Sequence, residues 1–490
     1  MPERVWLGVD VGTQGVRARA VTDDGRTIGA ATTNLVSTRK GTTSHRQEPA
    51  TWSQAAARAI RSVRADLGAH LVHAVAVDAT SGTVTVVDHR GVPIGAGLMY
   101  DDSTAAAHTD AVRDAGADVW SAHGYRINPT WALVKIRALA ADGVLGRGRF
   151  VAHQSDVVNA WLTGHRTATD ASNALKSGYD QLQRHWPEAT MARLGVDVRV
   201  LPDVVAPGVI LGAVGSKAAS LTGLAIGTPV VAGMSDACAA HLGAGPLELG
   251  RVVTSMGTTL TIKGVHDRLV TDDTGVLYSH PAPQDVGWLL GGASSCGAGV
   301  LSELFGGHNL ERLTQNVIED RVAPLPCYPL LGTGERFPWA AADARGFIGE
   351  ERASLDATAV QALGPAVVLA SVAHALAHLE RACLDTVVAA GGTVDGPVTF
   401  TGGASANPWW NQLRCDILGR PVRVPTGGDA ASGMAALARV GVTGEAVTAV
   451  TAQMATPSED LEPEQSRRTE FEHAHTRFLA CAPRPQPLRG

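Results

Sequence analysis

The hydrophobic pattern at the start of the chain predicts a series of short strands. Residues 5–11 are mostly apolar and rich in Val, and the run is too short for a helix, which favours a buried strand. After a Gly-Thr-Gln-Gly turn at 12–15, apolar and polar residues alternate over 16–20, as in a second strand. An Asp-Asp-Gly turn signal then precedes a third predicted strand over 26–33.

A helix and a further strand follow. Ala, Ile and Val recur at helical spacing over 49–67, where Thr51 is a candidate N-cap. Another apolar run, residues 71–77, predicts a buried strand that ends in the polar segment Asp-Ala-Thr-Ser-Gly-Thr at 78–83. The order strand, hairpin, strand, helix, strand is typical of an α/β layer.

A similar order starts again near residue 250. Strands are predicted over 251–255 and 260–263 around a Met-Gly-Thr-Thr turn, and a later strand over 397–400 ends in Thr-Gly-Gly-Ala-Ser. Each half thus has a Gly-Thr hairpin first and a strand with a small-residue end afterwards, which predicts a duplication. Two similar halves that face each other would place both Gly-Thr turns on one cleft. A Gly/Pro break at 243–246 predicts the boundary between two domains, residues 1–245 and 246–490.

Composition supports two globular domains and excludes some classes of partner. A chain of 490 residues exceeds what one hydrophobic core usually covers. A net charge of −6 without any Lys/Arg block argues against a nucleic-acid surface. The six cysteines are widely spaced with no C-x-x-C pair, as expected in a reducing cytosol. The most apolar long run, 366–379, contains His374 and His378 and predicts a core helix rather than a membrane span.

Asp10 at the end of the first strand is the first candidate for chemistry. Glycines in the turn at 12–15 let the backbone approach a ligand, and successive N–H groups there form an anion-binding concavity. A carboxylate beside bound phosphate suits an intervening metal ion. The turn has no Lys, so it is not a P-loop. The alternative is that Asp10 only caps its own hairpin.

Four motifs in order extend this hypothesis. They are Asp10–Arg17 (DVGTQGVR), Gly233–Asp236 (GMSD), Ser255–Thr259 (SMGTT) and Thr401–Ala404 (TGGA). Together they resemble the FGGY family of carbohydrate kinases, over about residues 4–440. Other segments are similar to the ribulokinase-like and xylulokinase-like (pentulose kinase) branch. The resemblance implies an α/β fold of two actin-like (ribonuclease H-like) ATPase domains, related by duplication, with a cleft between them.

The sequence also departs from the family pattern. A xylulokinase is expected to have Gln-Met-His-Gly near 79–82 and Trp-Asn-Asp near 100–104, where this chain has Ala-Thr-Ser-Gly and Tyr-Asp-Asp-Ser-Thr. Both segments belong to what the family uses as its sugar pocket. The differences therefore bear on the substrate rather than on the reaction.

The resemblance implies ATP-dependent phosphorylation of a primary hydroxyl of a ketopentose, with D-ribulose first and D-xylulose second. Asp236 would be the catalytic base that accepts the hydroxyl proton, although an Asp in this position can also serve as a helix N-cap. Asp10 would hold Mg²⁺ through water, since magnesium dehydrates reluctantly. Gly12 and Thr13 would meet the transferred phosphate.

The resemblance also assigns a nucleotide site to the second half. Gly257, Thr258 and Thr259 would meet the nucleotide phosphates. Adenine would lie on the backbone at Gly402 and Gly403, with Trp409 as its lid or as part of the core. A helix over 408–418 is predicted there, with Asn407 as its N-cap and Gly419 past its end.

Sugar-binding candidates lie where strands end in the first half. Besides Asp10 and Asp236, they are Ser81 and Asp102, with Tyr100 and Lys176 as weaker candidates. Glu335 and Arg336 in the second half are expected to form an ion pair that holds a loop or touches ligand.

The expected partners are ATP and a small sugar, with no nucleic acid and no membrane, for a cytoplasmic monomer or homodimer. One alternative is a kinase for another polyol or ketose, such as a ketoheptose, ribitol or glycerol. The other is a non-catalytic actin-like nucleotide-binding sensor. The acids Asp10 and Asp236 favour an enzyme over a sensor.

Overall fold

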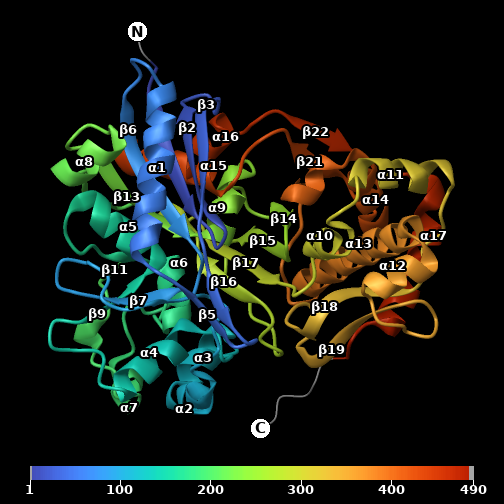
Figure 1. The fold of residues 1–490 in the computed structure, drawn as a ribbon, viewed down its shortest axis with the longest axis horizontal. Coiled ribbons are helices and arrows are strands. Elements are labelled where there is room, and N and C mark those ends of the chain that lie inside the picture. Colours follow the sequence, from blue (N-terminus) through green and yellow to red (C-terminus); the bar gives the residue numbers. More distant parts are fainter. Residues whose placement is uncertain (1–2, 485–490) are drawn as a thin grey trace. The chain divides into compact units, whose positions relative to one another are not determined.

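The computed structural model describes residues 3–484, which divide into two compact units (Figure 1). The first unit comprises Met1–Leu247, His280–Trp288 and Gly427–Thr456, and the second comprises Glu248–Ser279, Leu289–Thr426 and Pro457–Gly490. The chain first leaves the first unit close to the boundary expected at residue 245. The structure differs from the expected continuous domains because the chain then returns to the first unit twice.

A six-stranded sheet forms the centre of the first unit, in the order β12-β13-β6-β1-β2-β3. The strands are β1 (Val5–Val11), β2 (Gly15–Thr22), β3 (Thr27–Asn34), β6 (Val72–Ala79), β12 (Ile210–Ala213) and β13 (Pro229–Ser235). β1 pairs antiparallel with β2 and parallel with β6, which in turn pairs parallel with β13. Because β1, β6 and β13 are parallel, their carboxyl ends lie at one edge of the sheet.

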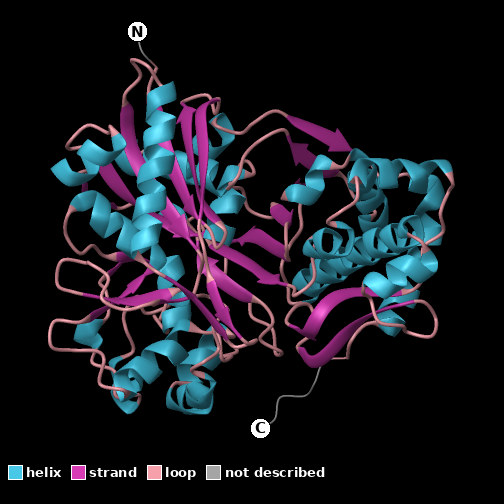
Figure 2. Cartoon of the chain, viewed as in Figure 1, coloured by secondary structure: helices cyan, strands magenta, loops and turns pink. Residues whose placement is uncertain are grey.

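Helices cover both faces of this sheet (Figure 2). Val5, Leu7, Val9 and Val11 pack with α1 (Ala50–Asp66) on one face. The opposite face packs against α15 (Ala430–Thr443), from the late segment that rejoins this unit. Gly8 allows the close approach, since a Cβ there would lie 1.7 Å from the carbonyl oxygen of Ala431. Asp10 alternates with the residues of the α1 face, so it belongs to the α15 face.

A second, five-stranded sheet completes the first unit, in the order β4-β5-β8-β7-β9. Its strands are β4 (Thr38–Lys40), β5 (Ser44–Gln47), β7 (Val84–Val87), β8 (Gly97–Leu98) and β9 (Phe150–His153). Strand β7 starts just after Gly82, and β8 ends just before Met99. This sheet therefore supports the two loops that the sequence marks as sugar-side candidates.

The second unit repeats the topology of the first. Its seven-stranded sheet has the order β16-β17-β15-β14-β20-β21-β22. The strands are β14 (Val252–Met256), β15 (Leu260–His266), β16 (Tyr278–Pro281), β17 (Trp288–Ala293), β20 (Val398–Thr401), β21 (Val422–Pro425) and β22 (Ser458–Leu461). β14 pairs antiparallel with β15 and parallel with β20, β20 pairs parallel with β21, and β22 is antiparallel. Strands β14, β15, β20, β21 and β22 thus have the same order and directions as β1, β2, β6, β13 and β12 of the first unit. This agreement confirms the predicted duplication.

The longest helix of the second unit is α13 (Pro365–Ala389), which contacts α14 (Pro408–Leu418) and α17 (Arg468–Cys481). Its length and apolar composition would suffice to cross a membrane, but 83% of its most apolar window is buried inside the structure. The prediction of a core helix is therefore confirmed. Asn407 caps α14 by accepting a hydrogen bond from Trp410 N, and Gly419 ends it, also as predicted.

His378 on α13 makes the folding of the second unit sensitive to acid. Its ring stacks on Phe478 of α17 with centroids 5.7 Å apart. Burial, together with the nearby His475, His374, Arg381 and Arg477, lowers the pKa of His378 to about 2. The unfolded chain binds this proton near the usual histidine pKa of about 6.5, so stability is present above that pH and is lost as pH falls below it.

Replacing His378 with Gln should remove this dependence. Between pH 7.5 and 5, the free energy of unfolding of the natural protein should fall by about 2 kcal/mol more than that of His378→Gln. Urea unfolding at several pH values measures the difference. Parallel pH profiles for the two proteins would contradict the prediction.

Candidate active site

Two acids from adjacent parallel strands begin the site. Asp10 on β1 and Asp78 on β6 are register partners, with 4% and 0% of their surface exposed. Arg17 on β2 donates from Nη1 to Asp10 Oδ2 at 2.8 Å. Asp429, the N-cap of α15, lies close enough to influence the charge of both acids and accepts a hydrogen bond from Arg19 Nε at 2.8 Å.

The pKa values of the two buried acids are both raised, that of Asp78 more strongly. Burial raises the pKa of Asp10, while the Arg17 guanidinium opposes this rise. Burial raises the pKa of Asp78 well above its usual value, and the negative charges of Asp10 and Asp236 raise it further. No donor in the described part of the protein bonds to either Asp78 oxygen, which adds to the cost of ionising this buried acid. Asp78 was not among the predicted site residues, although it directly follows the predicted strand over 71–77.

Asp236 follows the carboxyl end of β13 as the first residue of α9 (Asp236–Gly243). Its side chain is half-buried, and Oδ1 accepts a hydrogen bond from Ala237 N at 2.8 Å. The N-cap position is occupied by Ser235, so Asp236 is inside the helix rather than its N-cap. A helix N-terminus stabilises a negatively charged side chain in its first turn.

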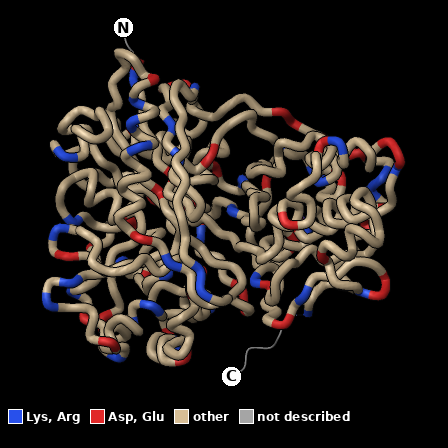
Figure 3. Tube along the Cα trace, viewed as in Figure 1, with Lys and Arg blue, Asp and Glu red and all other residues tan. Residues whose placement is uncertain are grey.

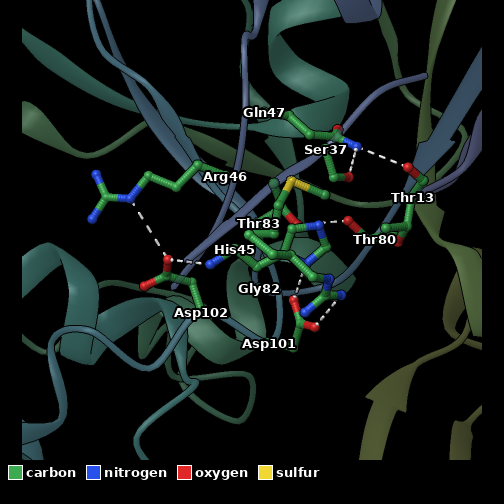
Figure 4. Close-up of polar contacts among 12 residues, drawn as sticks. Thr13, Ser37, His45, Arg46, Gln47, Thr80, Gly82, Thr83, Asp101 and Asp102 are labelled. Carbon is green, nitrogen blue, oxygen red and sulfur yellow. Dashed lines mark hydrogen bonds and ion pairs between the residues drawn. The ribbon is translucent and has the colours of Figure 1, made fainter. Parts of the chain in front are cut away.

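The predicted phosphate turn lies between β1 and β2. Gly12 N donates to Gly15 O at 3.0 Å, which closes the turn, and the half-buried Thr13 stands at its tip. The Thr13 carbonyl accepts a hydrogen bond from Gln47 Nε2 at 2.8 Å (Figure 4). The turn is therefore held from the side by strand β5, a contact that the sequence did not indicate.

The loop after β6 contains several buried polar groups. The Thr80 hydroxyl bonds to the Thr83 hydroxyl at 2.6 Å and donates to Gln154 Oε1 at 2.7 Å. Ser81 Oγ and Gln154 Nε2 are buried without a partner in the protein. Lys176 Nζ donates to Ser81 O at 3.2 Å. Because buried polar groups normally have hydrogen-bond partners, the orphaned Ser81 hydroxyl marks this loop as a place for a polar ligand.

The side chain of Asp102, a predicted sugar-binding residue, is fully buried. Its carboxylate accepts hydrogen bonds from His45 N at 2.9 Å (Figure 4) and from Thr104 N at 3.1 Å. These contacts hold its own loop. Its neighbour Asp101 is the more exposed acid and pairs with His45 and Arg39. Tyr100 is half-buried beside them.

The buried Lys135 ties the two sugar-side loops together. Its Nζ donates to Gly82 O at 3.0 Å and to Met99 O at 2.5 Å. Burial lowers its pKa to about 7, and Asp102 opposes that shift. Lys135 thus stabilises both the loop after β6 and the loop after β8.

The second unit contains a cavity of about 720 Å³. Among the predicted nucleotide residues, those that line it are Gly257, Thr258, Gly403 and Trp409. Two others lie outside the lining. Thr259 forms the turn itself by accepting from Gly257 N, and Gly402 has a φ of +85° and packs against the Met256 backbone. A purine base and its phosphates fit a cavity of this size and mixed lining.

The opposite wall of this cavity was not predicted. It is formed by α10 (Gly299–Phe305) and α11 (Leu310–Glu319). Leu310, Thr314 and Ile318 recur on one face of α11 and all line the cavity. A spacing of four residues is typical of one helix face, so this pattern in the sequence could have indicated that wall of the cavity.

Glu335 and Arg336 form a support rather than the expected ion pair. Glu335 is buried and accepts hydrogen bonds from Tyr328 OH at 2.7 Å and Ser295 N at 2.6 Å. Arg336 Nη2 instead donates to Ser294 O at 3.1 Å. Both residues therefore shape their loop, and neither lines the cavity.

Comparison with known proteins decides the family. The model of the FGGY carbohydrate kinase N-terminal domain matches residues 5–243, and that of the C-terminal domain matches residues 252–442. The chain belongs to the FGGY family of carbohydrate kinases. It is therefore a phosphotransferase enzyme with the two-domain, actin-like fold that FGGY kinases have.

Relatives of this FGGY kinase carry several substrate names. A xylulose kinase of Streptomyces coelicolor is 28% identical over 462 residues, covering 91% of this chain and 89% of the relative. A gluconokinase of Bacillus subtilis is 23% identical over 458 residues, covering 86% and 84%. The crystal structure of ligand-bound xylulose kinase from Lactobacillus acidophilus superposes with a TM-score of 0.85 at 16% identity, covering 98% and 97%. Sugar kinase activity is thus supported, while the names differ in the sugar.

Proposed function

We propose that this FGGY kinase transfers the γ-phosphoryl group of ATP to a primary hydroxyl of a ketopentose, D-ribulose first and D-xylulose second. The observation that carries the proposal is the placement of Asp236. Ser235 on β13 is the register partner of Ala79 on β6. Asp236 and the Thr80–Ser81 loop therefore leave the sheet side by side, which puts a base next to a polar site for a sugar.

Asp236 would act as the general base. The acceptor hydroxyl gives its proton to the Asp236 carboxylate as its oxygen bonds to the γ-phosphorus. The bond from that phosphorus to the β–γ bridging oxygen breaks, and ADP leaves with the electron pair. The base need not be strong, because the alkoxide develops only as the phosphoryl group arrives.

The nucleotide would bind in the cavity of the second unit. Adenine would lie against the backbone at Gly403 and the side chain of Trp409. The turn that contains Gly257 and Thr258 would donate backbone N–H groups to its phosphates. In the first unit, Gly12 and Thr13 would meet the phosphoryl group as it is transferred.

Mg²⁺ would be held by Asp10, through water. Among residues 3–484 no group of three or more His, Cys, Asp or Glu side chains forms a metal-binding cluster. The chemistry of the available donors nevertheless fits the ion, since magnesium favours carboxylate oxygens and retains several waters when phosphates supply other ligands. When bound, the ion would neutralise charge on the nucleotide.

A second candidate substrate is an aldonate, the class of substrate in the name gluconokinase. The observation that favours it is the Lys176 ammonium, 3.2 Å from Ser81 O, because a cation beside the sugar loop suits a carboxylate. We propose a cytoplasmic enzyme in either case. Lys, Arg, Asp and Glu are interspersed along the chain (Figure 3).

A substrate panel tests the proposal. Purified protein with ATP and Mg²⁺ is assayed for ADP release with D-ribulose, D-xylulose, a ketoheptose, ribitol, glycerol and gluconate. The highest kcat/KM is expected for D-ribulose. A preference for gluconate would favour the second candidate, and turnover of glycerol or ribitol alone would reject both.

The nucleotide site can be tested at Gly403. A side chain added there meets no protein atom within 4 Å, so Gly403→Leu should fold normally while its side chain occupies the cavity. We expect the KM for ATP to rise by about tenfold or more through steric exclusion, with the KM for sugar unchanged. Steady-state kinetics measure both constants.

Gly307→Leu is the matched control. Gly307 is also exposed with open space around it, but it does not line the cavity. Its KM for ATP should equal that of the natural protein. A normal KM for ATP in Gly403→Leu would place the nucleotide elsewhere.

A further inference from the structure

Gln47, the last residue of β5, has its side chain fixed at both ends. Its surface is 3% exposed. Trp52 Nε1 donates to Gln47 Oε1 at 2.6 Å. Gln47 Nε2 donates to Ser37 Oγ at 2.9 Å and to Thr13 O at 2.8 Å (Figure 4). An indole N–H can only donate, so the oxygen of the amide must face Trp52. The amide nitrogen must then face Thr13.

One of the two ends of the Gln47 side chain makes a contact that the packing of the core does not require. The fully buried Trp52 needs an acceptor for its indole, which explains the Oε1 contact. The Nε2 contact instead reaches the carbonyl of Thr13, in the turn closed by Gly12 N and Gly15 O. Gln47 therefore links the helix α1 to the phosphate turn.

Fixing this carbonyl also fixes the next N–H. The peptide unit is planar and trans, so the N–H of Gln14 points opposite to the Thr13 carbonyl. With that carbonyl directed at Gln47, the Gln14 N–H points away from β5, and Gln14 is on the exposed side of the turn. A backbone donor held in this way is suited to a phosphoryl oxygen.

The same strand also supports the sugar side. His45, two residues before Gln47, donates its backbone N–H to Asp102 Oδ2 at 2.9 Å, and Arg46 Nε lies 3.7 Å from that oxygen. β5 is thus attached to the loop after β8 and, through Gln47, to the phosphate turn. This four-residue strand therefore connects the phosphate turn to the loop after β8.

We propose that Gln47 is a positioning residue for phosphoryl transfer: its carboxamide holds the Thr13–Gln14 peptide so that the turn presents its N–H groups to the transferred phosphate. The inference rests on the proposed role of the Gly12–Gly15 turn. Gln47 acts through the backbone of that turn and does not touch the reacting atoms.

Gln47→Glu tests the hydrogen bond itself. The substitution keeps the shape of the side chain and the acceptor for Trp52, but an ionised carboxylate cannot donate to Thr13 O. At pH 8 we expect kcat to fall by about tenfold or more, with the KM values for ATP and sugar within about threefold of normal. As pH falls toward 6, the introduced carboxyl gains a proton at this buried site and can donate again, so the ratio of variant to natural kcat should rise.

Two further variants separate positioning from stability. Gln47→Met cannot donate at any pH, so its kcat ratio should stay low and constant across the same range. Ser37→Ala removes the other Nε2 contact and leaves the bond to Thr13, so its kcat should stay within about twofold of normal. Thermal unfolding of all three proteins checks that each is folded at the assay temperature.

The outcomes separate this inference from the proposed function. Natural protein that phosphorylates no sugar in the panel rejects the proposed function. In that case the same variants are compared in sugar-independent ATP hydrolysis, which uses the same turn with water as the acceptor. A pH-dependent deficit confined to Gln47→Glu supports the inference in either assay. Normal kcat in Gln47→Glu, or equal pH profiles for the Glu and Met variants, overturns it.

Discussion

Replacing Asp236 with Asn should lower kcat for sugar phosphorylation by about 10² to 10⁴-fold, the usual contribution of a general base. Asn preserves the shape and the acceptor oxygen for Ala237 N, which now lies 2.8 Å from Oδ1. It removes only the capacity to accept the proton of the sugar hydroxyl. The measurement is sugar-dependent ADP release, together with calorimetric titration of ATP, for which the dissociation constant should stay within about threefold.

Asp110→Asn is the matched control for that experiment. Asp110 is an acid in the first turn of a helix of the same unit, but its side chain is 87% exposed. Its kcat should equal that of the natural protein. Turnover of Asp236→Asn within tenfold of normal would show that another group accepts the proton.

Replacing Arg414 with Met should lower the free energy of unfolding by about 3–5 kcal/mol, because it leaves Glu380 as an unpaired buried charge. Both side chains are 0% exposed and form two hydrogen bonds of 2.7 Å between α13 and α14. The guanidinium also lies 3.6 Å from the centroid of the Phe400 ring on β20. Urea unfolding measures the loss.

The companion substitutions separate the charge from the packing. Replacing Arg414 and Glu380 together by Met removes both charges, so the double variant should regain part of the stability lost by Arg414→Met. The exposed pair Arg199–Asp197 is the control, and Arg199→Met should lower the free energy of unfolding much less than Arg414→Met does. A double variant no more stable than Arg414→Met would mean that the loss comes from shape rather than from the stranded charge.

Local sequence signals predicted most of the central elements. The Val-rich run at 5–11 coincides with β1, and the Asn, Pro and Gly signals around 407–419 coincide with the ends of α14. The strands β4 and β5 were missed because they are short and polar, and their pairing with distant strands supplies their order. The return of residues 427–456 to the first unit was missed for a related reason. It depends on long-range contacts of α15 with β1, β6 and α9, which are far away in the sequence or follow no local pattern.

In the candidate site, too, local sequence signals indicated some residues, whereas the placement of others depends on long-range contacts. Asp10 and Asp236 were singled out because each lies at or just after the end of a predicted strand beside glycine or small residues, and their roles stay predictions. The raised pKa of Asp78 depends on burial and on two neighbouring acids, which come from β1 and from the start of α9. Asp101 and Asp102 are adjacent acids, and only the contacts of β5 decide which one turns inward. The positions of the two acids in the sequence do not show which of them is buried.

The backbone contact between Gly8 and Ala431 constrains how the protein is made. Strand β1 is synthesised well before α15, which covers one of its faces and ends at Thr443. That face of the sheet therefore stays uncovered until α15 has also been made. A chain that stops before residue 427 lacks α15, and its uncovered sheet face is expected to favour association.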